Sequence, residues 1–216
     1  MAKTNPEELK AVFTDVRKAY RLLYHYQRRV MDTVRYISNM LSINLQSGHP
    51  IFSDLTPGEN KRPDLDRWAW DWLNMYFYEF YCTAKKIDTD TYQFAIQIQS
   101  DTGCYDTGAK ELDIENYSPA ELAATRLIFI YSKNRWKREQ QENHKRFTGF
   151  HSIPALSANQ PSTFKEEHDN GDKFFVMMTM PLENLVDESS IKSEIDRFLQ
   201  FLKQNNLTWA YEGQRI

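Results

Sequence analysis

The sequence has little glycine and little cysteine, and each shortage excludes a class of protein. Only 7 of the 216 residues are glycine, and neither phosphate-cradling loop, G-x-x-x-x-G-K-[ST] or G-x-G-x-x-G, occurs. The 2 cysteines, Cys82 and Cys104, cannot form a metal tetrad by themselves. We therefore expect neither a nucleotide-hydrolysing enzyme, nor a dinucleotide cofactor, nor a structural zinc site.

Long apolar runs and a secretory leader are also missing. No window approaches about 18 consecutive apolar residues, the length that a membrane-spanning helix needs. The polar start MAKTNPEELK has no apolar segment of the kind that a signal peptide contains. These absences predict a cytoplasmic protein with no membrane contact.

The local signatures of catalysis are absent as well. The chain contains neither G-x-S-x-G nor H-E-x-x-H, and its 5 histidines match no metal-ligand spacing. His168 has several acidic neighbours, a pattern more typical of a solvated acidic loop than of a metal site. We predict no catalytic residue, no metal ligand and no cofactor, which favours a non-catalytic protein and leaves the question of enzymatic activity open.

A long periodic segment at the N-terminus is the clearest feature present. Asn5, Pro6 and Glu8 supply an N-cap, a proline at the first helical position and a first-turn glutamate. Apolar residues then alternate in steps of four and three, as in a coiled-coil seam. They are Leu9, Phe13, Val16, Tyr20, Leu23, Val30, Val34, Ile37 and Leu41, with Gln27 replacing one apolar residue. A helix over residues 5–45 would be on the order of 60 Å long, too long for one small domain to cover.

This seam predicts a surface for a protein partner or a second copy of the chain. The residues expected there are Leu23, Gln27, Val30, Val34 and Ile37. The alternative is that the seam packs against the chain's own domain. Gln27 has two interpretations, a polar residue that sets the register between two helices or a surface residue where the helix leaves the core.

The stretch DRWAWDWLNMYFYEFYC, residues 66–82, carries eight aromatic rings. A sheet covered on both faces needs large side chains of this kind, so core packing is the preferred interpretation. A pocket for a small molecule is the alternative. Trp68 and Trp72 would share one face of a helix, and Trp70 would point elsewhere. We therefore predict Trp70 as a partner contact.

The remaining pattern predicts an α+β fold. Strands are expected within residues 75–87, 92–98, 125–132 and 173–180, loops over 46–65 and 133–172, a short helix from the capping box SPAE at 118–121, and a last helix after Pro181. The expected domain, residues 1–216, is a mainly antiparallel sheet of about four strands packed with a long N-terminal helix and a C-terminal helix. The long helix would serve as an arm for oligomerisation or partner binding.

Charge is distributed unevenly behind a net value of -3. Basic residues gather in segments 17–35 and 133–147, which suggests nucleic-acid binding as an alternative. The candidate contacts are Arg17, Arg21, Arg28, Arg29, Arg135, Trp136, Lys137 and Arg138. A sequence pI near 6.0 argues against this alternative. Our first hypothesis is a non-catalytic cytosolic interaction or regulatory protein that acts through the long helix; the alternatives are a small-molecule sensor with an aromatic pocket and a nucleic-acid-binding or processing protein.

Overall fold

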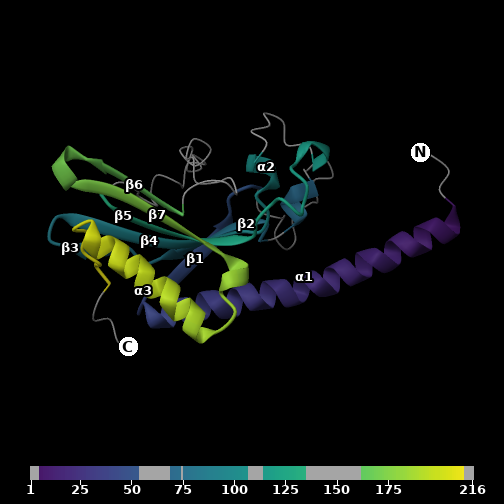
Figure 1. Cartoon of the computed structure of the whole chain (residues 1–216), viewed down its shortest axis with the longest axis horizontal. Helices are drawn as coiled ribbons and strands as arrows, with labels where there is room; N and C mark the ends of the chain where they lie inside the picture. Colours follow the sequence, from purple (N-terminus) through teal and green to yellow (C-terminus); the bar gives the residue numbers. More distant parts are fainter. Residues whose placement is uncertain (1–4, 54–68, 74, 107–113, 135–161, 212–216) are drawn as a thin grey trace, which may run out of the picture.

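The computed structural model describes residues 5–53, 69–73, 75–106, 114–134 and 162–211 of the chain (Figure 1). A long N-terminal helix and a C-terminal helix accompany an antiparallel sheet, so the predicted α+β class is confirmed. The predicted number of about four strands is wrong, because the described part of the chain contains a seven-stranded sheet.

The sheet has the strand order β1-β2-β4-β5-β7-β6, and β3 pairs with β4 outside this order. Every pair of neighbouring strands is antiparallel. The strands are β1 (Leu45–Pro50), β2 (Phe77–Cys82), β3 (Lys85–Ile87), β4 (Asp90–Gln99), β5 (Arg126–Lys133), β6 (Thr163–His168) and β7 (Lys173–Pro181). The longest strands, β4, β5 and β7, lie inside the sheet, where both edges of a strand are hydrogen-bonded.

The sequence pattern did not predict the two edge strands, β1 and β6, and it predicted one strand over residues 75–87 where the structure has two, β2 and β3. Each edge strand lies in a segment expected to be a loop. β1 contains Gly48 and Pro50, and β6 reads TFKEEH, so neither shows the apolar alternation of an inner strand. Edge strands tolerate such residues because the backbone groups along one of their sides do not hydrogen-bond to another strand. Gly48 is also required sterically, since an added Cβ would lie 2.6 Å from the Tyr78 ring and 2.7 Å from the Glu79 carbonyl oxygen.

The short helix predicted from SPAE at residues 118–121 is a turn instead. The Leu122 and Ala123 amides both donate to the Pro119 carbonyl, at 2.9 and 3.1 Å, and the chain then enters β5. Within the described residues, the short helices are η1 (Ala69–Trp72), α2 (Gly103–Asp106), η2 (Ile114–Asn116), η6 (Asp169–Gly171) and η7 (Leu182–Asn184). A capping pattern alone therefore did not determine a helix.

Each of the two long helices begins at a capped residue. α1 (Pro6–Met40) starts after Asn5, whose side-chain oxygen accepts from the Glu7 amide at 3.1 Å. α3 (Glu188–Gln204) starts after Asp187, which exchanges two hydrogen bonds with Ser190 in a capping box, at 2.8 and 3.0 Å. Such caps satisfy amides that would otherwise lack partners at a helix start. The helix predicted after Pro181 is thus confirmed.

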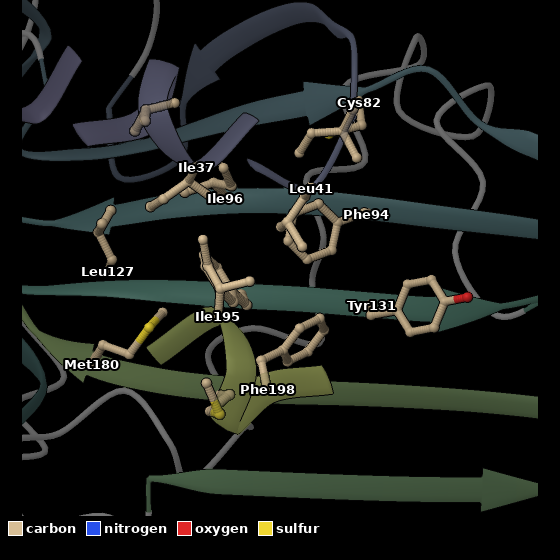
Figure 2. Close-up of a cluster of buried hydrophobic side chains, with 14 of the residues drawn as sticks. Ile37, Leu41, Cys82, Phe94, Ile96, Leu127, Tyr131, Met180, Ile195 and Phe198 are labelled. Atoms are coloured by element: carbon tan, nitrogen blue, oxygen red, sulfur yellow. The ribbon is translucent and has the colours of Figure 1, made fainter. Parts of the chain in front are cut away.

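The last part of α1 and all of α3 cover the same face of the sheet. Figure 2 shows Ile37 of α1, Leu41 just after this helix, and Ile195 and Phe198 of α3 over side chains of the inner strands. The Phe94 and Phe129 rings lie 5.4 Å apart within this core. The side chains between helices and sheet form the larger hydrophobic core of the described chain.

The opposite face of the sheet carries a second core. It contains Phe52, Phe77, Tyr81, Ala95, Cys104, Ile128, Ile130, Phe175 and Met177. Phe77 and Tyr81 of β2 point to this face, whereas Tyr78 and Phe80 pack against the first core. The aromatic residues of β2 are therefore shared between two cores, as the two-sided interpretation of the stretch expects.

Candidate functional site

α1 changes its surroundings partway along its length. Residues 6–25, which we call the arm, are exposed throughout except for the half-buried Thr14. Residues 26–40, which we call the root, pack on the sheet and on α3. Figure 1 shows the arm extending well beyond the sheet. A helix face that is apolar along both parts is thus covered in one part and uncovered in the other.

The root is held by the hydrogen bonds of two side chains, Tyr26 and Arg29, and by the burial of its apolar side chains. The Tyr26 hydroxyl is hydrogen-bonded to Ser100 Oγ at 2.7 Å. Arg29 donates to the Leu185 carbonyl and, at 2.7 Å, to the Val186 carbonyl just before α3. The buried side chains of the root are Val30, Thr33, Val34 and Ile37, all between 0% and 2% exposed. These contacts fix the direction in which the arm leaves the body.

This burial narrows the predicted partner surface. Val30, Val34 and Ile37 were expected to bind a partner, but the structure places all three in the chain's own core. The reason is that the sheet reaches far enough to cover the seam from Tyr26 onward. Gln27 is half-buried at this boundary, and Leu23 lies ahead of it with 40% of its surface exposed. The seam remains accessible only along the arm.

The arm presents a continuous apolar surface, which we call the stripe. It consists of Leu9, Val12, Phe13, Val16, Tyr20 and Leu23. Their exposed fractions range from 39% for Leu9 to 69% for Tyr20. Single exposed apolar residues are common, but a row of six on one helix face is typical of an interaction site. The steps of four and three residues also continue into the buried root, so both belong to one seam.

The arm's charged residues lie mostly outside the stripe and pair along the helix. Lys18 contacts Asp15 at 2.9 Å, and Arg17 donates to Thr14 Oγ1 at 2.9 Å. Pairs this exposed contribute little to stability, so these side chains can respond to a partner. Arg28 also forms an exposed pair, with Asp32 at 4.0 Å.

The nucleic-acid alternative stays a prediction. Of the basic residues proposed for it, Arg29 is engaged by backbone carbonyls at the root. Arg17, Arg21 and Arg28 are exposed on α1. The second group, Arg135, Trp136, Lys137 and Arg138, lies outside the described residues.

Trp70 lies in an aromatic cluster. Its ring centroid is 4.4 Å from that of Tyr76, 5.4 Å from Phe52 and 5.9 Å from Tyr117. It is half-buried against the second core, whereas Trp72 is 51% exposed. The role of Trp70 in partner binding stays a prediction, and the structure gives the ring a packing role.

A buried polar group lies on the sheet face opposite the helices. His49, Glu79 and Gln97 are directly opposite one another on β1, β2 and β4. Gln97 Nε2 donates to Glu79 Oε2, and the Tyr81 hydroxyl lies 3.2 Å from His49 Nε2. Burial raises the pKa of Glu79 to about 8, although hydrogen bonding from Gln97 opposes the rise. The carboxyl group is therefore mostly protonated at neutral pH.

Two oxygen atoms of this polar group have no hydrogen-bond partner among the described residues. They are Glu79 Oε1 and Gln97 Oε1, both buried. Buried polar atoms are nearly always paired, so an orphan pair points to water or to a bound group. The sequence signal for this site is a single acid within FYEFYC, in a strand that otherwise carries aromatic residues and a cysteine. That signal gives the position of the acid but not its pairing with Gln97.

Three further observations concern the described part of the chain. It holds no group of three or more His, Cys, Asp or Glu side chains arranged to bind a metal ion. None of its helices combines the length and the apolar character needed to cross a membrane. Both cysteines in it are buried free thiols, and burial raises the pKa of each. We therefore find no reactive thiolate in this part of the chain.

Comparison with known proteins identifies a family and a distant relative. A family model described as PM0109 matches residues 6–207. The uncharacterised protein PM0109 of Pasteurella multocida (strain Pm70) is 27% identical over 197 residues, which cover 86% of this chain and 90% of that protein. No solved structure matches. The match to the family model begins at the first residue of α1, so it includes the whole arm.

Proposed function

The chain belongs to the PM0109 family, and we propose that it is a non-catalytic protein that binds a protein partner through the arm of α1. The observation that carries this proposal is the exposed stripe on a helix that the body covers only from Tyr26 onward. A regulatory role would follow if binding at the arm changed what the body does. Binding itself is the part of the proposal that the stripe supports.

The free-energy cost of leaving apolar side chains in water explains why such an arm needs a partner. In proteins, most of the stability of a helix comes from packing its apolar face against other parts of the structure and not from helix propensity alone. Full burial of each large apolar side chain contributes roughly 1.5–3 kcal/mol. The six side chains of the stripe therefore represent a large free energy that the isolated chain leaves unused. A partner surface that covers the stripe would recover part of it.

The spacing of the stripe indicates what the partner looks like. Steps of four and three residues fit the 3.5-residue repeat with which two helices pack knobs into holes. A flat sheet surface would not require this repeat. The partner should therefore present an apolar helix of similar length, which would lie along the arm and end near Tyr26, where the body begins.

Photo-crosslinking in the cells that make the protein tests this proposal. A photoreactive amino acid replaces Val16 on the stripe or, in the control chain, Thr14 on the other side of the arm. We expect a covalent adduct of protein mass from the first position and much less from the second. Equal yields from the two positions, or no adduct from either, would contradict binding through the stripe.

A second function, small-molecule binding, is favoured by one observation. The protonated Glu79 carboxyl could donate a hydrogen bond from Oε1, and Gln97 Oε1 could accept one, so together they suit a ligand that carries an acceptor beside a donor. Native mass spectrometry of the purified chain and of a Glu79→Gln variant tests this. A small mass retained by the parent and lost from the variant would support it; two unliganded spectra, with no thermal shift by amine- or amide-bearing compounds, would count against it.

A further inference from the structure

We infer that the partner of the arm is a second copy of the chain and that the two arms pack antiparallel along their stripes. The two-fold axis crosses the stripe at a height along the helix midway between Thr14 and Asp15. This inference rests on the proposed function, because it names the occupant of the same stripe. Two observations on α1 carry it: the symmetry of the apolar spacing and the length of the exposed segment.

Four residues of the stripe have a spacing that reads identically in both directions. Leu9, Phe13, Val16 and Tyr20 follow one another in steps of four, three and four residues. An axis between Thr14 and Asp15 therefore sets Leu9 opposite Tyr20 of the partner subunit, and Phe13 opposite the partner's Val16. Each layer pairs one a position with one d position, which is the layer type of antiparallel coiled coils. A two-fold interface requires self-complementarity of this kind.

The length of the exposed segment fits the same register. Leu23 comes to lie opposite Pro6 of the partner subunit, at the start of the partner's helix. The partner's arm therefore ends just before Tyr26, where the body begins to cover the seam. A parallel partner would run along the same helix face into the body, because the stripe and the buried face of the root are continuous. The antiparallel arrangement avoids this clash.

The two borders of the stripe differ in charge. Val12 and Ala19 make one border apolar, so the two copies meet there without charge. On the other border Lys10 and the partner's Arg17 are like charges, which opposes association at low salt. Burial of the stripe must therefore supply the attraction, and we expect association to strengthen slightly as the salt concentration rises.

Cysteine crosslinking of the full chain tests the register. Leu9→Cys and Tyr20→Cys are prepared as separate variants, and the parent chain, whose two cysteines are buried, is the background control. Residues 9 and 20 are about 16 Å apart along a helix, since each residue rises about 1.5 Å. In the antiparallel register neither variant links to itself, but a mixture of the two forms a disulfide-linked dimer. Self-linking of each variant alone would indicate parallel arms and overturn the inference.

Sedimentation of the parent chain tests the stoichiometry. We expect a species of twice 25.6 kDa at micromolar concentration. Phe13→Glu with Val16→Glu should raise the dimer dissociation constant at least about 10-fold, because charges then replace two central apolar layers. Ala11→Glu with Thr14→Glu is the matched control, with the same charge change and spacing on the outer side of the arm. It should leave the dimer intact.

The outcomes separate this inference from the proposed function. An adduct of twice the chain mass in the Val16 photo-crosslinking experiment supports both. A parent chain that remains monomeric up to about 1 mM, where even a weak dimer would be populated, together with an adduct of another mass, overturns self-association and retains partner binding. A monomer with no adduct overturns both. Circular dichroism of each variant checks that the helices are intact.

Discussion

The arm and the root of α1 are two parts of one helix with the same apolar repeat but different surroundings. In the root, Val30, Val34 and Ile37 are almost completely buried under the sheet and α3. In the arm, Phe13 and Val16 repeat the pattern with about half of their surfaces exposed. The sequence periodicity therefore encodes a helix face that must be covered, and the body supplies a cover for only one part of it.

The largest expected difference between the two parts is how much the free energy of unfolding falls when a side chain is shortened to alanine. Ile37→Ala removes side-chain atoms from a packed core and should lower the free energy of unfolding by roughly 2–5 kcal/mol. Leu23→Ala should change it by less than about 0.5 kcal/mol, because Leu23 is 40% exposed. Urea denaturation at concentrations low enough to keep the chain monomeric measures both. Similar losses for the two variants would mean that the body covers the arm as well.

A second difference is dependence on pH, which should belong to the body and not to the arm. The pKa of Glu79 rises from its ordinary value of 4.5 to about 8 on folding, because the carboxyl is buried. The folded chain therefore holds a proton that the unfolded chain loses in this range. The stabilising contribution is complete below about pH 4.5 and is lost as the pH rises toward about 8, at up to about 1.4 kcal/mol per pH unit.

Glu79→Gln keeps the shape of this side chain and removes its titration. Denaturation between about pH 5 and 8.5 should show the parent losing stability with rising pH and the variant losing much less. Glu8→Gln in the first turn of the arm is the matched control, and its profile should follow that of the parent. Parallel profiles for the parent and the Glu79→Gln variant would show that Glu79 ionises without cost in the folded chain.

The smallest effect distinguishes the caps of the two long helices. Asp187→Ala removes the hydrogen bonds that the Asp187 carboxylate accepts from the Ser190 amide and the Ser189 hydroxyl, and it should lower Tm by about 2–4 °C. Asn5→Ala removes one bond at the tip of the arm and should leave Tm unchanged. Its effect should be confined to faster hydrogen exchange of the first turn, measured by mass spectrometry. A fall in Tm for Asn5→Ala would indicate that the arm unfolds together with the body.

The elements predicted correctly from the sequence are those whose own side chains determine them. α1 and α3 carry caps and an apolar stripe, and β4, β5 and β7 carry dense apolar runs. β1 and β6 were missed because their pairing with β2 and β7 holds them, while their own residues include Gly48, Pro50 and several charges. Pairing between distant segments has no signature in a local pattern.

The candidate sites were predictable to the same extent. The apolar seam of α1 is evident from the spacing alone. The point where the body stops covering the seam depends on where the sheet lies, so Val30 is buried and Leu23 is 40% exposed. The contact between Glu79 and Gln97 depends on the register of β2 against β4, so no local pattern predicts it. Trp70 was singled out by helical geometry, whereas the structure gives it aromatic neighbours.

Residues 7–40 contain neither glycine nor proline, and α1 runs through them without a break. The arm is therefore a continuous helix joined rigidly to the body, so any change in its length also rotates the stripe about the helix axis. Inserting one residue before Tyr26 would move the tip by about 1.5 Å and turn the stripe by about 100° relative to the root. Length variation within the arm should therefore be tolerated only in whole heptads, which preserve the direction in which the stripe faces.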